Sequence, residues 1–271
     1  MPSINQALRH FDLPRLEARL LLAQVTGLSH AAMVSAAHDE LSAEQWQAFS
    51  ALAARRLAGE PVAYLLGARE FYGREFAVTP AVLIPRPETE HLVEATLAKV
   101  GRMRPARVVD LGTGSGIIAC TLALEAPQWQ VAAVDLSADA LQVARGNAAR
   151  LGAQVAFHHG SWLAPLPAGE RFDAIVSNPP YIEQHDHHLD EGDVRFEPRM
   201  ALTDENDGLD CLRAIVAAAP ARLLPGGWLL LEHGYDQGAA CRALLVYAGF
   251  VQVATLPDLA GNDRVTLGQL A

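Results

Sequence analysis

The sequence predicts an α/β protein whose larger part is a mostly parallel sheet with helices on both faces. From Pro105 onward, short apolar runs alternate with helical stretches, and this alternation is typical of a doubly wound sheet. A hydrophobic content of 51% in 271 residues supports a substantial core. No apolar run approaches the roughly eighteen residues of a membrane-spanning helix, so we expect no membrane segment.

The first residues predict short helices rather than strands. Leu13-Pro14 precedes an apolar stripe at helical spacing, and Ser42 is a candidate N-cap for a helix that runs to Arg56. No cluster of residues with evident chemistry occurs within residues 3–57. We therefore interpret residues 1–75 as an N-terminal helical domain.

A linker follows this domain. Gly59-Glu60-Pro61 breaks the last helix, and glycines separate short β-like pieces at 63–67, 69–73 and 76–78. These pieces predict a β-hairpin linker, whose boundaries we set at residues 76–90. A helix is expected from about Thr89 to Val100, so the larger domain occupies residues 91–271.

Within the larger domain the elements follow in regular order. Helices are expected at residues 115–124, 137–151, 208–221 and 236–248, and strands at 107–111, 131–135, 155–158, 172–177, 228–232 and 250–255. Ligands of such sheets bind beyond the carboxyl ends of the strands. Candidate site residues are therefore those that follow the strands.

Charge and cysteine content limit the partners. The net charge is −10, and residues 1–80, with seven arginines and eight carboxylates, carry little of it. Nucleic-acid binding relies on cationic surface, so we expect no direct nucleic-acid binding. The three cysteines are widely spaced without a CxxC pair, which indicates free thiols in a reducing compartment and hence the cytoplasm.

Asn178-Pro179-Pro180-Tyr181 directly follows the apolar run 172–177 and is the most informative motif. Two consecutive prolines cannot continue a strand, because proline has no N–H and a fixed φ. The resulting turn presents one amide, acceptor carbonyls and an aromatic ring. Asn178 can accept one N–H of a planar NH2 group, a proline carbonyl can accept the other, and Tyr181 can stack on the plane.

A glycine-rich turn follows the first strand of the larger domain. Gly112-Thr113-Gly114-Ser115-Gly116 combines close backbone approach with the free N–H groups of a helix start. Its third glycine comes one residue earlier than in the dinucleotide fingerprint, so a nicotinamide or flavin fits less well. Asp135, at the end of the next strand, can accept both hydroxyls of a ribose, and Trp162 can cover an adenine face.

No metal site is predicted. His185-Asp186-His187-His188 with Asp190 offers metal-ligating side chains, but adjacent histidines on a loop more often form a solvated polar stretch, and no second, distant ligand set is evident.

Together these motifs resemble class I methyltransferases that use S-adenosyl-L-methionine, and further segments are similar to the PrmC/HemK family. These segments are Pro61-Val62-Ala63-Tyr64-Leu65-Leu66-Gly67, Arg69-Glu70-Phe71-Tyr72-Gly73, Ile84-Pro85-Arg86-Pro87-Glu88-Thr89-Glu90, Glu197-Pro198, Asp207-Gly208-Leu209, Gly226-Gly227, Glu232-His233-Gly234 and Asp258-Leu259-Ala260-Gly261. The resemblance implies a Rossmann-like domain with a seven-stranded sheet and an N-terminal domain that binds release factors. It also implies methylation of the glutamine side-chain nitrogen (N5) in the Gly-Gly-Gln motif of class-1 peptide chain release factors, a step of translation termination.

The resemblance also implies roles for individual residues. Gly112, Thr113, Gly114, Ser115 and Gly116 would lie against the methionine half of the cofactor, Asp135 at the ribose, and Trp162 beside the adenine. Asn178 would face both cofactor and substrate. Asn178, Pro179, Pro180 and Tyr181 would bind the substrate amide, with Asn178, Pro179 and Tyr181 catalytic. Ser161 and His233 depart from the family pattern.

Other functions remain open at this stage. An enzyme that methylates adenine N6, cytosine N4 or guanine N2 in nucleic acid would use the same proline turn, although the acidic charge weighs against it. A nicotinamide-dependent oxidoreductase is disfavoured by the glycine spacing. A silent partner-binding module would need a broken cofactor site, whereas the glycines and Asp135 are present. A monomer is the simplest expected state.

Overall fold

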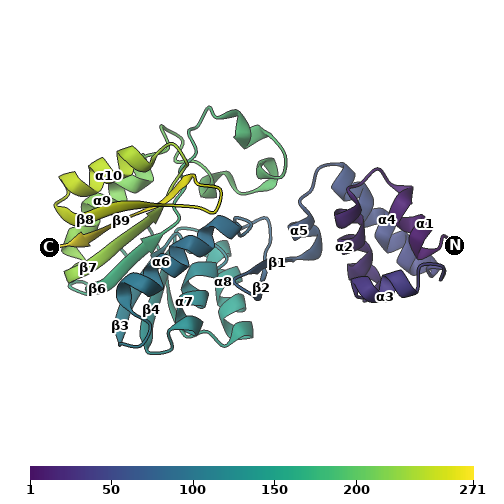
Figure 1. Ribbon diagram of the computed structural model, residues 1–271, viewed down its shortest axis with the longest axis horizontal. Coiled ribbons are helices and arrows are strands. Elements are labelled where there is room, and N and C mark those ends of the chain that lie inside the picture. The colour runs from purple at the N-terminus through teal and green to yellow at the C-terminus, as the bar shows by residue number, and fades with distance from the viewer. The chain divides into compact units, whose positions relative to one another are not determined.

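The computed structural model describes residues 1–271, which divide into two units. One unit comprises Met1–Ala68 and Gly192–Phe196, and the other comprises Arg69–Glu191 and Glu197–Ala271. The first unit thus ends its main segment at Ala68, seven residues before the predicted boundary at residue 75. The hairpin strands, β1 (Ala68–Phe71) and β2 (Arg74–Ala77), likewise precede most of the predicted 76–90 linker (Figure 1).

The N-terminal unit is helical, as predicted. Its helices are α1 (Ile4–His10), α2 (Arg15–Thr26), α3 (His30–Ser35), α4 (Ala43–Leu57) and α5 (Val62–Leu66), and η3 (Val194–Phe196) belongs to the same unit. Ser42 caps α4, since its Oγ accepts the N–H of Gln45 at 3.1 Å while the Gln45 side chain accepts the N–H of Ser42 at 2.9 Å. This reciprocal capping box satisfies two N–H groups that the helix leaves unpaired.

The α5 helix corrects a prediction, because its residues were expected to be β-like. Pro61 precedes the helix with a compatible φ of −57°, and Gly67 ends it in the left-handed region at φ 71°. Leu65 is buried in the core of the N-terminal unit. A five-residue apolar run carries no clear period, so burial in a helical core decides its conformation.

The larger unit is built on a seven-stranded sheet in the order β5-β4-β3-β6-β7-β9-β8. Its strands are β3 (Ala106–Leu111), β4 (Trp129–Asp135), β5 (Val155–His159), β6 (Phe172–Ser177), β7 (Leu223–Glu232), β8 (Phe250–Pro257) and β9 (Asp263–Leu270). The pairs from β5 to β7 are parallel, whereas β9 runs antiparallel to both β7 and β8. The six strands located in the sequence are confirmed, and β9 is the strand that the pattern did not locate.

Helices cover both faces of this sheet (Figure 1). On one face lie α6 (Glu90–Val100), α7 (Ile117–Glu125) and α8 (Ala138–Leu151); on the other lie α9 (Asp210–Ala218) and α10 (Gly238–Tyr247). Short 3₁₀ turns complete the unit: η1 (Pro87–Thr89), η2 (His187–Asp190), η4 (Arg199–Ala201) and η5 (Ala219–Ala221). No helix has the length and apolar character needed to cross a membrane.

The alternation of side chains along β3 explains why both faces need cover. Val108 packs into the core shared with α6 and α7, while Val109 and Leu111 pack into the core shared with α9 and α10. All three side chains are fully buried, and burial of each contributes about 1.5–3 kcal/mol. A strand with apolar residues on both faces reads as a continuous run, as the sequence shows.

The strand order determines where along the sheet a ligand can bind. After β3 the chain adds β4 and then β5 on one side, and it returns to add β6 on the other side of β3. At such a switch point the loops leave the carboxyl ends of adjacent strands in opposite directions and open a crevice. The residues that follow β3, β4 and β6 are therefore brought together.

Candidate active site

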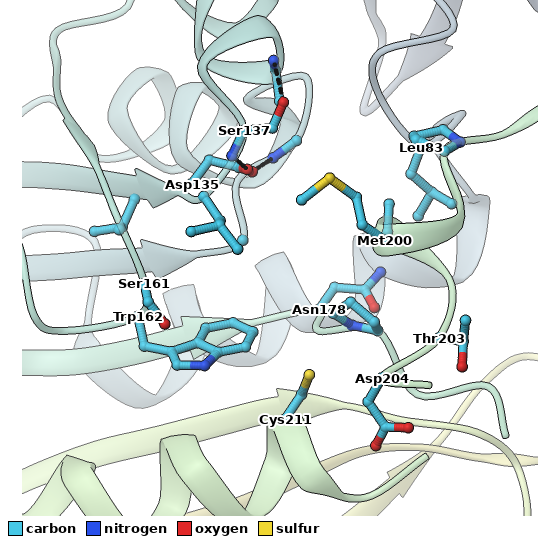
Figure 2. Close-up of a pocket in the computed structure, with 18 of the residues that line it drawn as sticks. Leu83, Asp135, Ser137, Ser161, Trp162, Asn178, Met200, Thr203, Asp204 and Cys211 are labelled. Carbon is cyan, nitrogen blue, oxygen red and sulfur yellow. Dashed lines mark hydrogen bonds between the residues drawn. The ribbon is translucent and has the colours of Figure 1, made fainter. Parts of the chain in front are cut away.

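A cavity of about 430 Å³ lies beyond the carboxyl ends of β3, β4 and β6, inside the larger unit. Figure 2 shows Asp135 and Asn178 on opposite sides of it. The predicted site residues that line it are Gly112, Gly114, Asp135, Trp162, Asn178 and Pro180. Residues that sequence reasoning did not select also line it, among them Leu83, Ser137, Met200, Thr203, Asp204 and Cys211.

One side of the cavity, here called the Asp135 wall (Gly112, Gly114, Asp135 and Ser137), is held by the backbone. Asp135 accepts the N–H of Gly114 on Oδ2 and the N–H of Ser137 on Oδ1, each at 2.8 Å. Each carboxylate oxygen keeps a further lone pair for a ligand. Gly112 has a φ of 72°, a conformation that side chains disfavour.

The remaining residues of the glycine turn support it from below. Thr113 donates its hydroxyl to Asp110 Oδ2 at 2.6 Å, and Ser115 accepts the Asn147 side-chain amide on its carbonyl at 2.9 Å. A Cβ on Gly116 would meet Ala144 at 3.1 Å, so this glycine allows α7 and α8 to approach. Thr113, Ser115 and Gly116 are thus placed behind the cavity rather than in its lining.

Of two acidic groups next to the glycine turn, Asp110 is buried and Asp135 is half-buried. Burial raises the pKa of Asp135, and it raises the pKa of Asp110 to about 7 although the Thr113 hydroxyl opposes the shift. Asp110 Oδ1 is buried without a hydrogen-bond partner. Two acidic side chains beside this turn disfavour an anionic ligand group there.

Trp162 lines the cavity, and Figure 2 shows its indole ring on the same side as Cys211. Its φ is 45°, in the left-handed region that a bulky residue rarely adopts. Strain of this kind persists where the surrounding structure imposes it, and it clusters at ligand sites. Trp162 is in position to cover one face of a planar group.

The opposite side, here called the Asn178 wall (Leu83, Asn178, Pro180 and Pro198), is assembled from distant segments. Asn178 Nδ2 donates to Thr89 Oγ1 at 3.2 Å, which leaves Asn178 Oδ1 as the acceptor of that amide. Ile84 donates its N–H to Glu197 Oε2 at 2.8 Å, and Arg86 forms an ion pair with the same carboxylate. These contacts join the Leu83 segment to the Pro198 segment.

Two predicted catalytic residues do not reach the lining. Pro179 is buried and Tyr181 is half-buried, and neither borders the cavity. Burial raises the pKa of the Tyr181 hydroxyl, and Glu232 adds to this shift, whereas Arg264 opposes it. The Tyr181 carbonyl accepts the Gln237 side-chain amide at 2.9 Å, so this residue anchors the turn to the segment before α10.

The lining of the cavity identifies the kind of ligand that fits. It contains the carboxylates of Asp135, Asp204 and Glu205 and no lysine, arginine or histidine. A pyrophosphate needs cationic or N–H-rich surroundings, so a dinucleotide fits poorly. S-adenosyl-L-methionine carries a sulfonium and an ammonium, which match the acidic groups of the lining. Its ribose diol matches Asp135, and its adenine matches the apolar surface of Trp162. The residues present therefore fit this cofactor.

The two departures from the family pattern are both accommodated. Ser161 lines the cavity beside Trp162. His233 is buried, with Nε2 2.7 Å from Thr266 Oγ1 and Nδ1 2.8 Å from the Gly234 carbonyl. Because both ring nitrogens have partners and burial lowers its pKa, His233 is a satisfied neutral residue.

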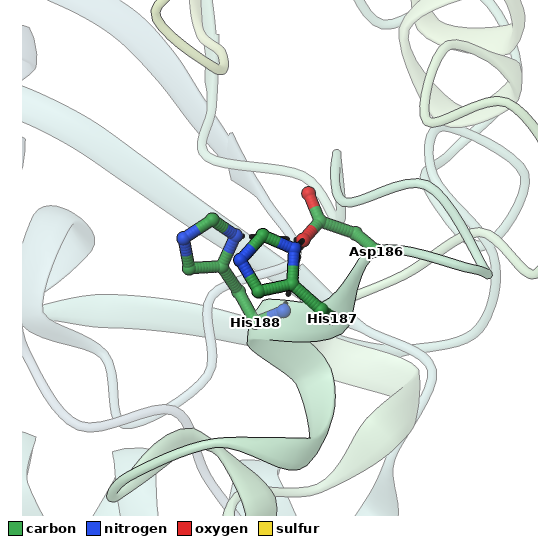
Figure 3. A group of neighbouring side chains, drawn as sticks. All are labelled: Asp186, His187 and His188. Carbon is green, nitrogen blue, oxygen red and sulfur yellow. Dashed lines mark hydrogen bonds and ion pairs between the residues drawn. The ribbon is translucent and has the colours of Figure 1, made fainter.

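A separate group of side chains gathers Asp186, His187 and His188 (Figure 3). Their ligand atoms lie within 4.8 Å of one another, and Asp186 Oδ1 contacts His188 Nδ1 at 2.6 Å and also accepts the His188 N–H. The aspartate thus caps η2. The absence of a metal site remains a prediction.

Comparison with known proteins agrees with this architecture. The model "PrmC N-terminal domain" matches residues 3–67, and "Methyltransferase small domain" matches residues 89–194. A 16S rRNA N2 G1207 methyltransferase of T. thermophilus shares the fold at TM-score 0.58 and 22% identity, over 75% of this chain and 50% of that one. The hMettl16 catalytic domain does so at TM-score 0.60 and 18% identity, over 77% and 81%. The fold and the site define a Rossmann-like methyltransferase.

Similarity over the full length then identifies the family. The release factor glutamine methyltransferase of Bordetella pertussis is 57% identical over 100% of both chains, and that of Neisseria gonorrhoeae is 57% identical over 95% of this chain and 94% of its own. The protein belongs to the release factor glutamine methyltransferase family. It is a methyltransferase, and S-adenosyl-L-methionine is its cofactor.

Proposed function

We propose that this enzyme transfers a methyl group from S-adenosyl-L-methionine to the side-chain nitrogen of the glutamine in the Gly-Gly-Gln motif of class-1 release factors. The observation that carries the proposal is the placement of Asn178. It borders the cavity, and its nitrogen is engaged by Thr89, so its oxygen can accept a hydrogen from an incoming amide. The names of the full-length relatives support the same substrate.

The task of these residues is orientation. An amide nitrogen is a poor nucleophile, because its lone pair takes part in the resonance that gives the peptide bond a barrier of ~18–20 kcal/mol. The cofactor supplies a strongly electrophilic methyl group when it is bound. Asn178 Oδ1 accepts one amide hydrogen, while Pro179, Pro180 and Tyr181 keep the turn rigid. Placement of this kind contributes on the order of 7–11 kcal/mol.

The Asp135 wall holds the cofactor in this proposal. Asp135 accepts the ribose hydroxyls through its remaining lone pairs, and Trp162 covers the adenine. The backbone of Gly112 and Gly114 would lie along the methionine end, with Thr113 and Ser115 fixing the turn from behind. The lining provides no basic side chain, which suits a cationic cofactor.

The N-terminal unit is proposed to bind the release factor, because a glutamine on a large protein needs recognition beyond one side chain. Residues 1–80, which span most of this unit and the hairpin after it, are nearly neutral in charge, with seven arginines and eight carboxylates. We further propose that the enzyme acts as a monomer in the cytoplasm without direct contact to nucleic acid. The net charge of −10 disfavours nucleic acid as a partner, and the three free cysteines suit a reducing compartment.

Methyl transfer to a purified release factor tests the proposal. The enzyme, labelled cofactor and a class-1 release factor should give a peptide heavier by one methyl on the Gly-Gly-Gln glutamine. A release factor with glutamate at that position is the matched control and should stay unlabelled. The nucleic-acid alternative predicts label in DNA or RNA instead, and that result with an unlabelled release factor would reject the proposal.

A further inference from the structure

Behind the cavity, Asn178 contacts a buried polar pair formed by Thr89 and Glu232. Glu232 is the last residue of β7, and its neighbour Leu231 pairs with Ser177 on β6, so Glu232 lies next to Asn178 across the sheet. Thr89 ends η1, on a segment 89 residues away from Asn178 along the chain. Thr89 and Glu232 are each 1% exposed. Neither borders the cavity.

The hydrogen bonds of this group have a defined direction. Thr89 Oγ1 accepts a hydrogen from Asn178 Nδ2, so the hydrogen of the Thr89 hydroxyl is left to donate elsewhere. The Glu232 carboxylate faces it, and the donors of Thr89 and Asn178 both act to lower the pKa of Glu232. Glu232 Oε2 is buried without a hydrogen-bond partner, which leaves acceptor capacity beside these donors.

An ionised carboxylate can only accept hydrogen bonds. It therefore draws the Thr89 hydrogen toward itself, and the Thr89 oxygen then presents a lone pair to Asn178. Only the NH2 group of the Asn178 amide can donate a hydrogen bond to this lone pair, so the Asn178 oxygen must face the cavity. A flipped amide would instead direct its NH2 at the substrate and would repel another NH2.

We propose that Glu232 and Thr89 are positioning residues that hold the Asn178 amide with its oxygen toward the cavity, and so make the site select an NH2 group. This inference rests on the proposed function of the same site. According to this inference, Glu232 and Thr89, which lie outside the cavity, determine whether the site accepts an amide or a carboxylate. The requirement is for the negative charge of Glu232 together with the hydroxyl of Thr89.

The surroundings of Glu232 determine when this constraint operates. Burial raises its pKa to about 7, Glu88 from η1 acts in the same direction, and Arg264 from β9 opposes it. Tyr181, from the turn after β6, is the other titratable group that interacts with Glu232. A protonated Glu232 can donate to Thr89, which can then donate to Asn178 and stabilise the flipped amide. Acidification through the titration of Glu232 should therefore slow methylation.

Four variants test the proposal. Glu232→Gln keeps the shape but adds a donor, Thr89→Val removes the hydroxyl, and Thr89→Ser keeps it. Asp173→Asn is the control, because it neutralises a half-buried carboxylate at the opposite end of β6, where Asp173 pairs with Arg104. Single-turnover methylation of a release factor is measured from pH 5.5 to 8.5, with cofactor affinity measured by calorimetry.

The expected pattern separates positioning from general structure. Glu232→Gln and Thr89→Val should lose about 30-fold or more in rate at pH 8 with cofactor affinity within threefold. Thr89→Ser should stay within about threefold of the unmodified enzyme, and Asp173→Asn should match it. The methylation rate of the Asp173→Asn enzyme should fall as the pH is lowered through the titration of Glu232. This fall should be absent in Glu232→Gln.

Two results would overturn the proposal: rates within twofold in both Glu232→Gln and Thr89→Val, or a loss of cofactor affinity as large as the loss of rate. If Glu232→Gln does not fold, the Thr89→Val and Thr89→Ser pair decides alone. A second measurement needs no activity: the side-chain amide hydrogens of Asn178, followed by NMR, should exchange slowly in the unmodified enzyme and at least tenfold faster in Thr89→Val. An inactive unmodified enzyme with protected hydrogens would reject the proposed function and retain this inference.

Discussion

The two walls of the cavity are held in different ways. In the Asp135 wall, Asp135 accepts backbone N–H groups from Gly114 and Ser137, which are 21 and 2 positions away along the chain. The Asn178 wall instead depends on side-chain contacts between residues that are 89, 111 and 113 positions apart. A wall built from two consecutive strands and the helix between them is fixed as soon as that β–α–β unit folds. A wall built from distant segments is fixed only when the whole unit has packed.

This difference matches what each wall has to do. Cofactor recognition needs a few acceptors and apolar faces at set depths, which one turn and the next strand end can provide. Substrate recognition needs one amide in one of two orientations, and only partners with a fixed donor or acceptor role can distinguish these orientations. Buried partners from other segments, here Thr89 and Glu232, can do so.

The sharpest test of the division is Asn178→Ala. It removes the acceptor that aims the substrate and leaves the Asp135 wall intact, so turnover should fall by about 10³-fold or more while cofactor affinity stays within tenfold. Single-turnover methylation and calorimetry measure the two quantities. Near-normal methylation by this variant would show that the Asn178 wall does not orient the substrate.

The next largest effect should come from Glu197→Gln, which breaks the long-range support of the Asn178 wall. The new amide would direct a donor at Ile84 N–H or Arg86, both of which donate to the carboxylate. The free energy of unfolding should fall by about 2–3 kcal/mol. Urea denaturation measures it, with Glu75→Gln on an exposed part of β2 as a control expected within about 0.5 kcal/mol.

Cofactor affinity should respond differently. If Glu197→Gln weakened cofactor binding by more than tenfold in the folded protein, the two walls would have to be treated as one cooperative unit, and the contrast between them would fail.

Asp135→Ala addresses the other wall. It removes acceptors for the ribose and releases the N–H groups of Gly114 and Ser137, so cofactor affinity should weaken by about 1–3 kcal/mol. Calorimetry with the cofactor measures this loss. The rate at saturating cofactor should change less than in Asn178→Ala, and unchanged affinity would remove Asp135 from the site.

The same contrast explains how much of the molecule can be predicted from the sequence. Local sequence patterns are enough to recognise three features in order along the chain: the glycine turn, Asp135 and the strand before Asn178. Glu232 and Thr89 do not, because nothing local distinguishes a buried acceptor beside a distant amide from an ordinary strand-end glutamate or helix-start threonine. Both lie in segments that carry the family resemblance, which is the only signal that could have selected them.

Two errors of the fold have related causes. The α5 run is too short to show a period, so its helix depends on packing against the other helices of its unit. The β9 strand, Asp263–Leu270, contains Gly268 and polar residues between its apolar ones. It is stabilised by antiparallel pairing with β7 and β8, a contact that the local sequence does not indicate.

The smallest expected effect concerns pH and Asp110, which holds Thr113 behind the Asp135 wall. The pKa of Asp110 is raised by burial to about 7, above its value in the unfolded chain, so the folded state holds the proton more tightly. The stability contribution is therefore fully present below about pH 4 and is lost as the pH rises through 7.

Asp110→Asn keeps an acceptor for Thr113 and removes the titration. Between pH 6 and pH 8 the unmodified protein should lose about 1–2 kcal/mol more unfolding free energy than this variant, as measured by urea denaturation at each pH. Because Glu232 titrates in the same direction in both proteins, the difference isolates Asp110, and equal slopes would mean that Asp110 is ionised in the folded protein across this range.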